Sequence, residues 1–211
     1  MARPRAPLLS REKIVTTALS LIDEEGLAAL TTRRLAGLLG VSGPSLYNHF
    51  ATMDDLVEAV ADTVIGEVDL DGLGGVADLP WHEAMRHWAR SYRDVLAAHP
   101  NLVPIAVHGP GRRRSALRMA DAVYGATVRA GWPPREATEI GALMRFFVAG
   151  AALGSFAGGF SEDPALYSED YPHLSRAHLL ASRGRDIDDA AFELGLDSLL
   201  AGLVARRGSV G

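Results

Sequence analysis

The chain has 211 residues, no cysteine and a formal net charge of −5 at pH 7. This length allows one or two compact domains, since a typical domain has about 100–200 residues. The lack of cysteine excludes a disulfide framework, a thiolate metal site and a cysteine nucleophile. No uninterrupted apolar run reaches the length of about 20 residues that a bilayer-spanning helix needs, so we expect a soluble, cytoplasmic protein with no membrane partner.

The chain begins with MARPRAPLLS, which contains Arg3 and Arg5 but no long apolar run or cleavage signal. This composition favours a flexible basic arm over a signal peptide. Residues 10–26, SREKIVTTALSLIDEEG, then predict an amphipathic helix. Its apolar face is formed by Ile14, Ala18, Leu21 and Ile22.

Residues 31–50, TTRRLAGLLGVSGPSLYNHF, have the pattern of two short helices joined by a tight turn. A hydroxyl of Thr31 or Thr32 can cap the first helix by accepting a bond from an unpaired backbone N–H, and Gly40 can end it. Two short helices with a glycine in the turn make a helix-turn-helix. Three leucines of the first helix are expected on one inward face: Leu35, Leu38 and Leu39.

The second helix of this pair is expected over residues 45–50, after Pro44, because proline is favourable in a first helical turn. Leu46 and Phe50 are four residues apart and should both face inward. The outward side chains suit base edges, thymine methyls and phosphates, although they would also suit the ordinary surface of a helical hairpin. These outward residues are Gly43, Pro44, Ser45, Tyr47, Asn48 and His49.

Thr52 is placed to cap a further helix, whose first turn contains Asp54 and Asp55. The N-terminal part therefore predicts a three-helix DNA-binding head with a connecting fourth helix. The stretch ALSLIDEEGLAALTTRRLAGLLGVSGPSLYNHF and the D-D-L that follows resemble the TetR/AcrR family. This resemblance implies a regulator that binds an operator in double-stranded DNA, and it disfavours an enzyme. The family usually has a lysine at the start of the fourth helix, where this chain has Met53, so Thr52 and the helix N-terminal amides are left to bind that phosphate.

The resemblance also implies roles within the head. Thr32 and Tyr47 match family positions that touch phosphates. Arg33, Pro44 and Ser45 match positions near bases. The full set of expected DNA-binding residues is Thr32, Arg33, Gly43, Pro44, Ser45, Tyr47, Asn48, His49 and Thr52.

The overall acidity is unusual for a DNA-binding protein, but the charges are unevenly distributed. Residues 1–50 contain six basic and four acidic residues, a net charge of +2, which leaves −7 for the remainder. Binding is steered by the local field at the DNA surface and not by the chain average. Because +2 is modest, each protomer should bind DNA weakly alone. The arginines at 112–114 lie far along the chain, where we expect a solvated or acid-paired face.

Beyond a Gly-rich, acidic stretch at residues 69–79, the hydrophobic periodicity predicts four long helices. Pro80 is placed to open the first of them. An acidic loop is expected over residues 162–171 and a short helix over residues 174–181. The four long helices are expected over residues 81–99, 112–130, 134–158 and 186–206.

A heavy aromatic stripe runs along the helix expected over residues 81–99. Core packing explains this stripe, and the lining of a mostly apolar ligand cavity would explain part of it. Arg145 hints at an anionic or carbonyl-bearing effector, although an ion pair with Glu139 or Asp121 explains it equally well. The expected effector-binding residues are Trp88, Tyr92, His108, Tyr124, Arg145 and Phe147.

Tetracycline-binding members of the family hold a magnesium-chelated drug through a histidine and an acidic residue on the facing long helix. The segment AVHGP suggests His108 for the first of these ligands, but Gly154 stands near the second. The residues therefore do not support that metal–drug site. We expect His108 to be a polar residue in a pocket wall, and we expect no metal and no cofactor.

The two last long helices have more apolar surface than one chain needs. In the family, the corresponding pair packs against its symmetry mate as a four-helix bundle. Residues 140–156 and 190–203 resemble that pair, and Gly150 and Gly154 would allow a close approach. One face of the last helix is expected to contain Ile187, Ala191, Leu194, Leu199 and Leu203, with Phe192 and Leu196 beside it.

These patterns predict an all-α protein with a helix-turn-helix DNA-binding domain at residues 1–52. Residues 53–211 are expected to form the connecting helix and a C-terminal helical ligand-binding and dimerisation domain. The expected function is a ligand-responsive repressor that binds a palindromic operator as a homodimer and is released by a small, largely apolar molecule. One alternative is a ligand-independent DNA-binding protein with a solid core. Another is a small helical enzyme, although no Ser-His-Asp, HExxH or glycine-rich phosphate motif is present.

Overall fold

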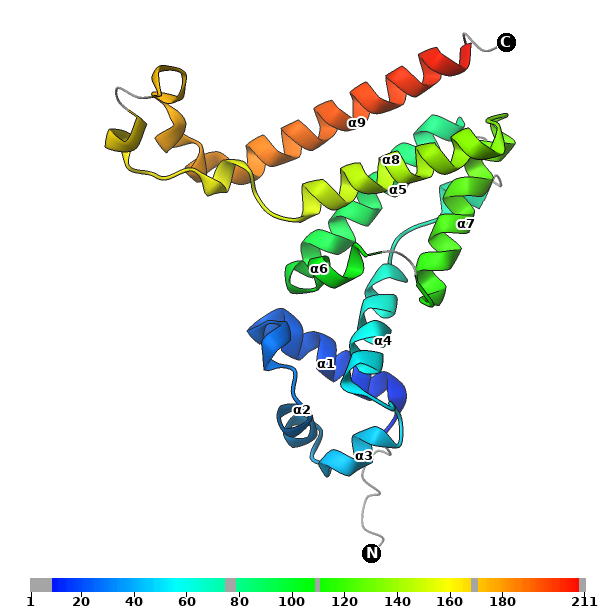
Figure 1. The fold of residues 1–211 in the computed structure, drawn as a ribbon, viewed down its shortest axis with the longest axis vertical. Helices are drawn as coiled ribbons and strands as arrows, with labels where there is room; N and C mark the ends of the chain where they lie inside the picture. Colours follow the sequence, from blue (N-terminus) through cyan, green and yellow to red (C-terminus); the bar gives the residue numbers. More distant parts are fainter. Residues whose placement is uncertain (1–8, 75–78, 109–110, 168–170, 209–211) are drawn as a thin grey trace, which may run out of the picture. The chain divides into compact units, whose positions relative to one another are not determined.

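The computed structural model describes residues 9–74, 79–108, 111–167 and 171–208. These residues form α-helices and 3-10 helices and no strand, which confirms the all-α class (Figure 1). The chain divides into two compact units, Met1–Asp69 with Asp94–Ala122 and Leu70–Arg93 with Val123–Gly211. The basic arm with Arg3 and Arg5 lies outside the described residues, and the division of roles at residue 52 stays a prediction.

The first unit contains the predicted helix-turn-helix and its supports. Its helices are α1 (Arg11–Glu25), α2 (Thr32–Leu39), α3 (Gly43–Tyr47), α4 (Met53–Ile65) and α6 (Val103–Ala106), with the 3-10 helices η1 (Leu27–Ala29) and η3 (Pro100–Leu102). The first part of α7 (Arg114–Arg129) belongs to the same unit. The helix predicted over residues 45–50 is α3 at residues 43–47, because Pro44 and Gly43 already belong to its first turn.

The starts of three helices follow from single hydroxyl side chains. Ser10 Oγ accepts the N–H of Lys13 at 3.1 Å, and Thr31 Oγ1 accepts the N–H of Arg34 at 3.2 Å. Thr52 and Asp55 form a reciprocal capping box at the start of α4. Gly40 ends α2 at a φ of 66°, a conformation that glycine adopts without strain.

One apolar core joins α1 to α4. It contains Ile14, Ala18, Ile22, Leu35, Leu46, Phe50, Leu56, Val60 and Val64. Leu46 and Phe50 face inward as predicted. The prediction for Leu38 was wrong: Leu35 is 0% exposed, whereas Leu38 is 52% exposed. An eight-residue helix turns through about 300° between residues 35 and 38, so these two leucines lie on neighbouring sides and only one reaches the core.

The second unit is built from the first part of α5 (Trp81–Ala98), the last part of α7, α8 (Pro134–Ala152) and α9 (Gly184–Gly208). The helix predicted to continue to residue 158 ends at Ala152, and the 3-10 helix η4 (Ala157–Gly159) follows it. The expected short helix at 174–181 is instead η6 (Pro172–Leu174), η7 (Ala177–Leu179) and η8 (Ala181–Arg183). Tight 3-10 turns are usual in such short pieces. The unit also contains η2 (Asp71–Gly74) and η5 (Pro164–Tyr167).

Helices α8 and α9 contact each other through an aromatic pair and a glycine. The rings of Phe147 and Phe192 stack with centroids 5.1 Å apart. A Cβ built on Gly195 would lie 2.6 Å from Phe147 Cε2, so the glycine makes room for that ring. The buried face of α9 is formed by Phe192, Leu196 and Leu200.

Three ion pairs join α5 to α9 along the second unit. Arg86 pairs with Asp197, Arg90 with Glu193 and Arg93 with Asp189. The arginines follow one another by three or four residues and the acids by four, so each set lies on one helix face. The Arg90 hydrogen bond lowers the pKa of Glu193, and the same bond raises the pKa of Arg90.

The other faces of α8 and α9 carry exposed apolar side chains. Phe146 and Leu194 are each 70% exposed. The predicted shared face with Leu194 and Ala191 is therefore not the face that α9 buries within one chain. The side of α9 that is buried is the one with Phe192, because Phe147 of α8 stacks on that ring.

Residues of α8 also correct an expectation about membranes. An 18-residue window within Pro134–Gly159 has a mean hydropathy of 1.6, enough by length and composition for a bilayer span. The high average hydropathy of this segment comes from its alanines and larger apolar residues. A helix that packs in a soluble protein passes the same test, so the segment is weak evidence for a membrane.

Candidate nucleic-acid interface

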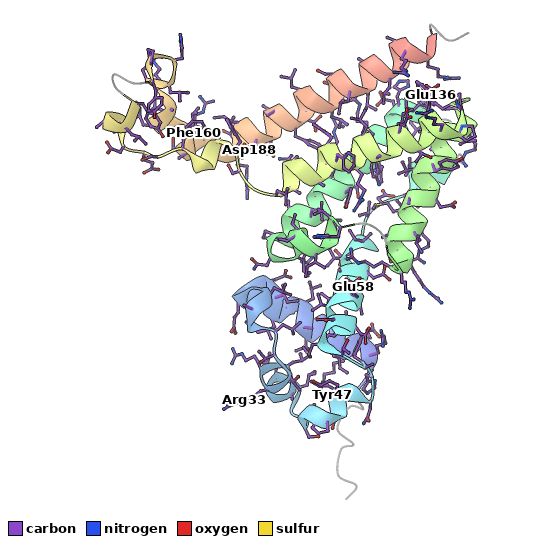
Figure 2. The ribbon with its side chains drawn as sticks, viewed as in Figure 1. Arg33, Tyr47, Glu58, Glu136, Phe160 and Asp188 are labelled. Atoms are coloured by element: carbon purple, nitrogen blue, oxygen red, sulfur yellow. The ribbon has the colours of Figure 1, made fainter. Side chains whose placement is uncertain are left out.

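The predicted recognition surface lies on α2 and α3. Tyr47, Asn48 and Pro44 are exposed, whereas Ser45 and His49 are half-buried. Figure 2 shows Tyr47 on α3 and Arg33 pointing away from α2. The burial of Leu46 and Phe50 explains this arrangement, because it turns the intervening side chains outward.

A hydrogen bond ties the two helices of this surface together. Thr32 Oγ1 and Tyr47 Oη lie 3.0 Å apart, and either hydroxyl can be the donor. Gly43 also packs closely against α2, since a Cβ there would lie 3.2 Å from Thr32 Cγ2. Two of the residues expected to contact phosphates, Thr32 and Tyr47, are thus brought together.

The two arginines of α2 differ in their surroundings. Arg34 forms an ion pair with Glu25 at the end of α1. Arg33 is exposed, as expected for a side chain that reaches into a groove. At the start of α4, Thr52 Oγ1 already accepts the N–H of Asp55. A hydroxyl that accepts this bond can still donate its own hydrogen, so the proposed phosphate contact at this end would use Thr52 Oγ1 together with the remaining N-terminal amides.

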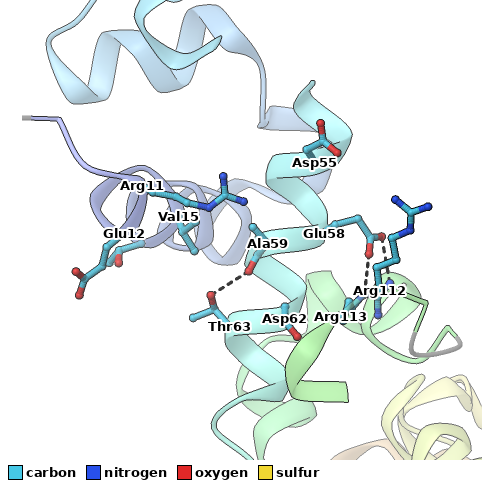
Figure 3. Close-up of a pocket in the computed structure, with 11 residues that line it drawn as sticks. Arg11, Glu12, Val15, Asp55, Glu58, Ala59, Asp62, Thr63, Arg112 and Arg113 are labelled. Atoms are coloured by element: carbon cyan, nitrogen blue, oxygen red, sulfur yellow. Dashed lines mark hydrogen bonds and ion pairs between the residues drawn. The ribbon is translucent and has the colours of Figure 1, made fainter. Parts of the chain in front are cut away.

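A polar groove of about 880 Å³ lies on the first unit between α1, α4 and the residues that precede α7 (Figure 3). It is an open groove and differs from the enclosed apolar cavity expected for an effector. Both carboxylates and guanidinium groups line it. Its charged lining residues are Arg11, Glu12, Asp55, Glu58, Asp62, Arg112 and Arg113.

Arg113 is the buried charged residue among those that line this groove, at 6% exposure. Its Nε donates to Glu58 Oε2 at 2.7 Å and its Nη2 to Glu58 Oε1 at 3.2 Å, while Nη1 donates to the Ala106 carbonyl. This hydrogen bonding lowers the pKa of Glu58. One turn along α4, Asp62 Oδ1 accepts the N–H of Ser115 at 2.7 Å. The acid-paired reading is therefore confirmed for Arg113, which joins α4, α6 and the start of α7.

Sequence reasoning missed a second cationic contact, at Arg11. Its Nη1 donates to the His49 carbonyl at 2.7 Å, and its guanidinium carbon lies 3.9 Å from the centroid of the Phe50 ring. The two partners are 38 or more positions away in sequence, so no local spacing signals them. Arg11 thereby connects the start of α1 to the end of α3.

The candidate effector residues are distributed over both units. His108 is exposed and belongs to the first unit, and the others belong to the second. Trp88 and Tyr92 are buried neighbours with ring centroids 5.8 Å apart. The described residues contain no group of three or more potential His, Asp or Glu metal ligands. The set Trp88, Tyr92, His108, Tyr124, Arg145 and Phe147 stays a prediction.

Two sequence families match the chain in separate regions. Residues 14–60 match the family "Bacterial regulatory proteins, tetR family". Residues 77–207 match the family "Tetracyclin repressor-like, C-terminal domain". The second match alone covers more than half of the chain.

Individual proteins are similar along almost the whole chain. The tetracycline repressor protein class A from transposon 1721 of Escherichia coli is 32% identical over 203 residues, which cover 94% of this chain and 92% of that protein. A solved structure of a possible TetR family transcriptional regulator from Streptomyces coelicolor A3(2) is 33% identical, has a TM-score of 0.77, and is matched over 93% of this chain and 99% of that chain. The Streptomyces coelicolor TetR family protein ActR, solved in complex with (S)-DNPA, is 32% identical with a TM-score of 0.74, over 95% of this chain and 98% of that chain.

Proposed function

The chain belongs to the TetR family of ligand-responsive transcriptional repressors, and we propose from this premise that it binds a palindromic operator as a homodimer and is released by a small, largely apolar effector. The observation that carries the proposal is the outward face of α3. Leu46 of α3 and Phe50, just beyond its end, are buried, which leaves Tyr47 and Asn48 exposed for DNA. A two-fold dimer would present two such faces to two half-sites. We propose that the protein is located in the cytoplasm, where the DNA is.

The proposed interface residues divide into two roles. Tyr47, Thr32, Thr52 and the α4 amides would bind phosphates, which fixes the position of the head on the duplex. Arg33 and Ser45 would contact base edges, which selects the sequence. The other proposed contacts are Gly43, Pro44, Asn48 and His49.

The exposed apolar face of α8 and α9 supports a homodimer. Phe146 of α8 and Leu194 of α9 are each 70% exposed. Large apolar side chains that gather at the surface are typical of protein–protein interaction sites. A second copy of the same face would cover it, since a two-fold interface is self-complementary. This packing also accounts for the high hydropathy of Pro134–Gly159 without a membrane.

The effector site is proposed in the second unit, around Trp88 and Phe147. Trp88 is 2% exposed, and its indole Nε1 has no hydrogen-bond partner among the described residues. Buried donors are normally satisfied, so an effector with an acceptor at that point would remove a cost. The effector must bind the DNA-incompetent state more tightly, because equal affinity for both states shifts nothing.

The segment from Pro100 to His108 is the proposed path to the head. Asn101 Nδ2 in this segment donates to the Ile22 carbonyl of α1 at 2.9 Å. Helix α6 contacts α4, and Arg113 bonds both the α6 carbonyl of Ala106 and Glu58 of α4. A displacement of α6 would thereby reach α4, which carries the head.

A DNA-selection experiment tests the proposal. The wild-type protein selects duplexes from a random pool, and fluorescence anisotropy then measures two variants on the selected site and on single-base mutants of it. Tyr47→Phe should weaken all sequences alike, because it removes a phosphate contact. Arg33→Ala should relax specificity at one position by about 1–3 kcal/mol.

The matched control is Arg135→Ala, which removes an arginine that is exposed on α8. It should leave both affinity and specificity at the wild-type level. Undiminished binding by both head variants would contradict the assignment of the interface.

A further inference from the structure

The recognition helix α3 cannot hold its own orientation. It has five residues, and its N-cap residue Ser42 makes no side-chain cap hydrogen bond. Isolated helices shorter than about 12 residues are marginal in water. Only Leu46 is buried within α3 itself. The direction in which Asn48 and His49 point must therefore be set by side chains from other elements.

Arg11 supplies such a side chain at the C-terminal end of α3. The His49 carbonyl lies directly after Asn48, the C-cap residue of α3. Arg11 Nη1 donates to it at 2.7 Å. A cation at this end also interacts favourably with the partial negative charge of the helix terminus.

The same guanidinium also fixes the residue that anchors α3 in the core. Its central carbon lies 3.9 Å from the centroid of the Phe50 ring, a distance typical of a cation–π contact. Arginine can serve both partners at once, because its planar group stacks on an aromatic face while its N–H groups donate in the plane. His49 and Phe50 are consecutive, so the two contacts together restrict how the chain leaves α3.

We infer that Arg11 is a positioning residue for DNA reading, which sets the orientation of the recognition helix through His49 and Phe50. The inference rests on the proposed function, since it assumes that α3 faces the bases. Asn48 lies directly before His49, so a change in the backbone at His49 changes where both side chains reach. Loss of Arg11 should therefore reduce the discrimination between sequences more than it reduces general attraction to DNA.

A plain phosphate-binding role for Arg11 makes a different prediction. A cation that neutralises one phosphate changes the slope of log affinity against log salt by about 0.9, and it acts on every sequence. A positioning residue changes affinity for the selected sequence at a nearly constant salt slope. Salt dependence and sequence dependence together separate the two roles.

The experiment compares Arg11→Ala with Lys13→Ala in the full-length protein. Lys13 lies in the same first turn of α1 and is exposed, so its loss removes the same charge without a contact to α3. The probes are the duplex that the wild type selects from a random pool and a scrambled duplex of the same composition. Affinities are measured by anisotropy at several salt concentrations, and melting temperatures show that the variants are folded.

Arg11→Ala should bind the selected duplex about tenfold more weakly than Lys13→Ala does, given the usual size of a cation–π contact and a charged hydrogen bond. On the scrambled duplex the two variants should have equal affinities, and their slopes of log affinity against log salt should match. Arg11→Lys keeps the charge and one donor and should recover part of the loss. Amide resonances of His49 and Phe50 in the DNA-free protein should shift in Arg11→Ala and not in Lys13→Ala.

Three outcomes would overturn the inference. Equal behaviour of Arg11→Ala and Lys13→Ala on both duplexes would reduce Arg11 to a surface charge. An equal loss on both duplexes with a smaller salt slope would make it a phosphate contact. Unshifted His49 and Phe50 amides would exclude positioning even if affinity fell. If the wild type selects no sequence at all, the proposed function itself fails. This outcome is seen before any variant is measured, so it is distinct from a failure of the inference about Arg11.

Discussion

The two units of this protein differ in how completely they bury their apolar side chains within one chain. In the first unit, α1 to α4 meet in one apolar core, and the ion pair of Arg113 with Glu58 has a buried guanidinium. In the second unit, α9 is joined to α5 by ion pairs at the surface, while Phe146 and Leu194 remain exposed. Within one chain, the first unit buries its apolar side chains in a core, whereas the second unit leaves large apolar side chains of α8 and α9 exposed.

This difference shows where each part of the function is built. The head reads DNA and needs a fixed shape, which an apolar core provides in every protomer. The proposed homodimer would cover the exposed apolar face of α8 and α9, so pairing would add to the stability of the second unit. Substitutions in the core of the first unit and on the exposed face of the second unit should therefore differ strongly in their effects on stability, assembly and DNA binding.

The largest effect is expected from Gly150→Arg. A Cβ at Gly150 would meet no atom within 4 Å and the residue is exposed, so the fold of one chain should tolerate a side chain there. In a dimer the new charge would be buried without a partner, at a cost of several kcal/mol. Sedimentation should show monomers, and operator affinity should fall by at least about 100-fold because two half-sites are no longer bound together.

The matched control is Ala120→Arg on α7, which is exposed in the first unit. It should remain dimeric. An unaltered dimer in Gly150→Arg would argue against the α8 and α9 face as the interface.

The next largest effect should be Leu35→Ala in the head. Removing a fully buried leucine costs about 2–5 kcal/mol of unfolding free energy. Leu38→Ala, on the same helix but 52% exposed, should cost less than about 0.5 kcal/mol. Urea denaturation of both variants measures the difference, and similar losses would show that α2 is rotated from its described position.

A smaller effect is expected from Glu58→Gln, which leaves the buried guanidinium of Arg113 without a countercharge. We expect a loss of about 1–3 kcal/mol at neutral pH. The pKa of Glu58 is lowered in the folded protein, mainly by the Arg113 hydrogen bond. Its contribution is therefore fully present above the unfolded pKa of about 4.3 and is lost as the pH falls through the lower folded value. The difference between wild type and variant should shrink below about pH 4, and a difference that grew there would contradict this account.

The smallest effect should come from Arg90→Ala on the surface of the second unit. Exposed ion pairs contribute about 0.2–1 kcal/mol and are screened by salt. The stability difference from the wild type should nearly vanish in about 1 M salt. A larger, salt-independent loss would mean that the α5 and α9 ion pairs are not simple surface contacts.

Local patterns were sufficient to predict the helix starts and most of the head core. Ser10 and Thr52 are caps that act on residues three positions away, and Leu46 and Phe50 share a face at a spacing of four. Leu38 was misplaced because a short helix offers few apolar residues from which to fix its phase.

Contacts distant in sequence could not be predicted in the same way. Arg113 and Glu58 are 55 residues apart, and Arg11 and His49 are 38 apart. Each pair depends on how whole helices pack, which the spacing of charges does not encode. The residues of the proposed effector site would form contacts of the same long-range kind, since they come from several helices.

The contact between Phe147 and Gly195 has a consequence for mutational tolerance. Any side chain at Gly195 would collide with the Phe147 ring, which is itself stacked on Phe192. Almost no substitution should therefore be tolerated at this position. Gly202, on the same helix, has no atom within 4 Å of an added Cβ. Alanine there should be accepted in a saturation library and even enriched under thermal selection, since it favours a helix by about 1 kcal/mol over glycine. Two glycines seven residues apart should thus differ in their tolerance to substitution, and the reason is steric.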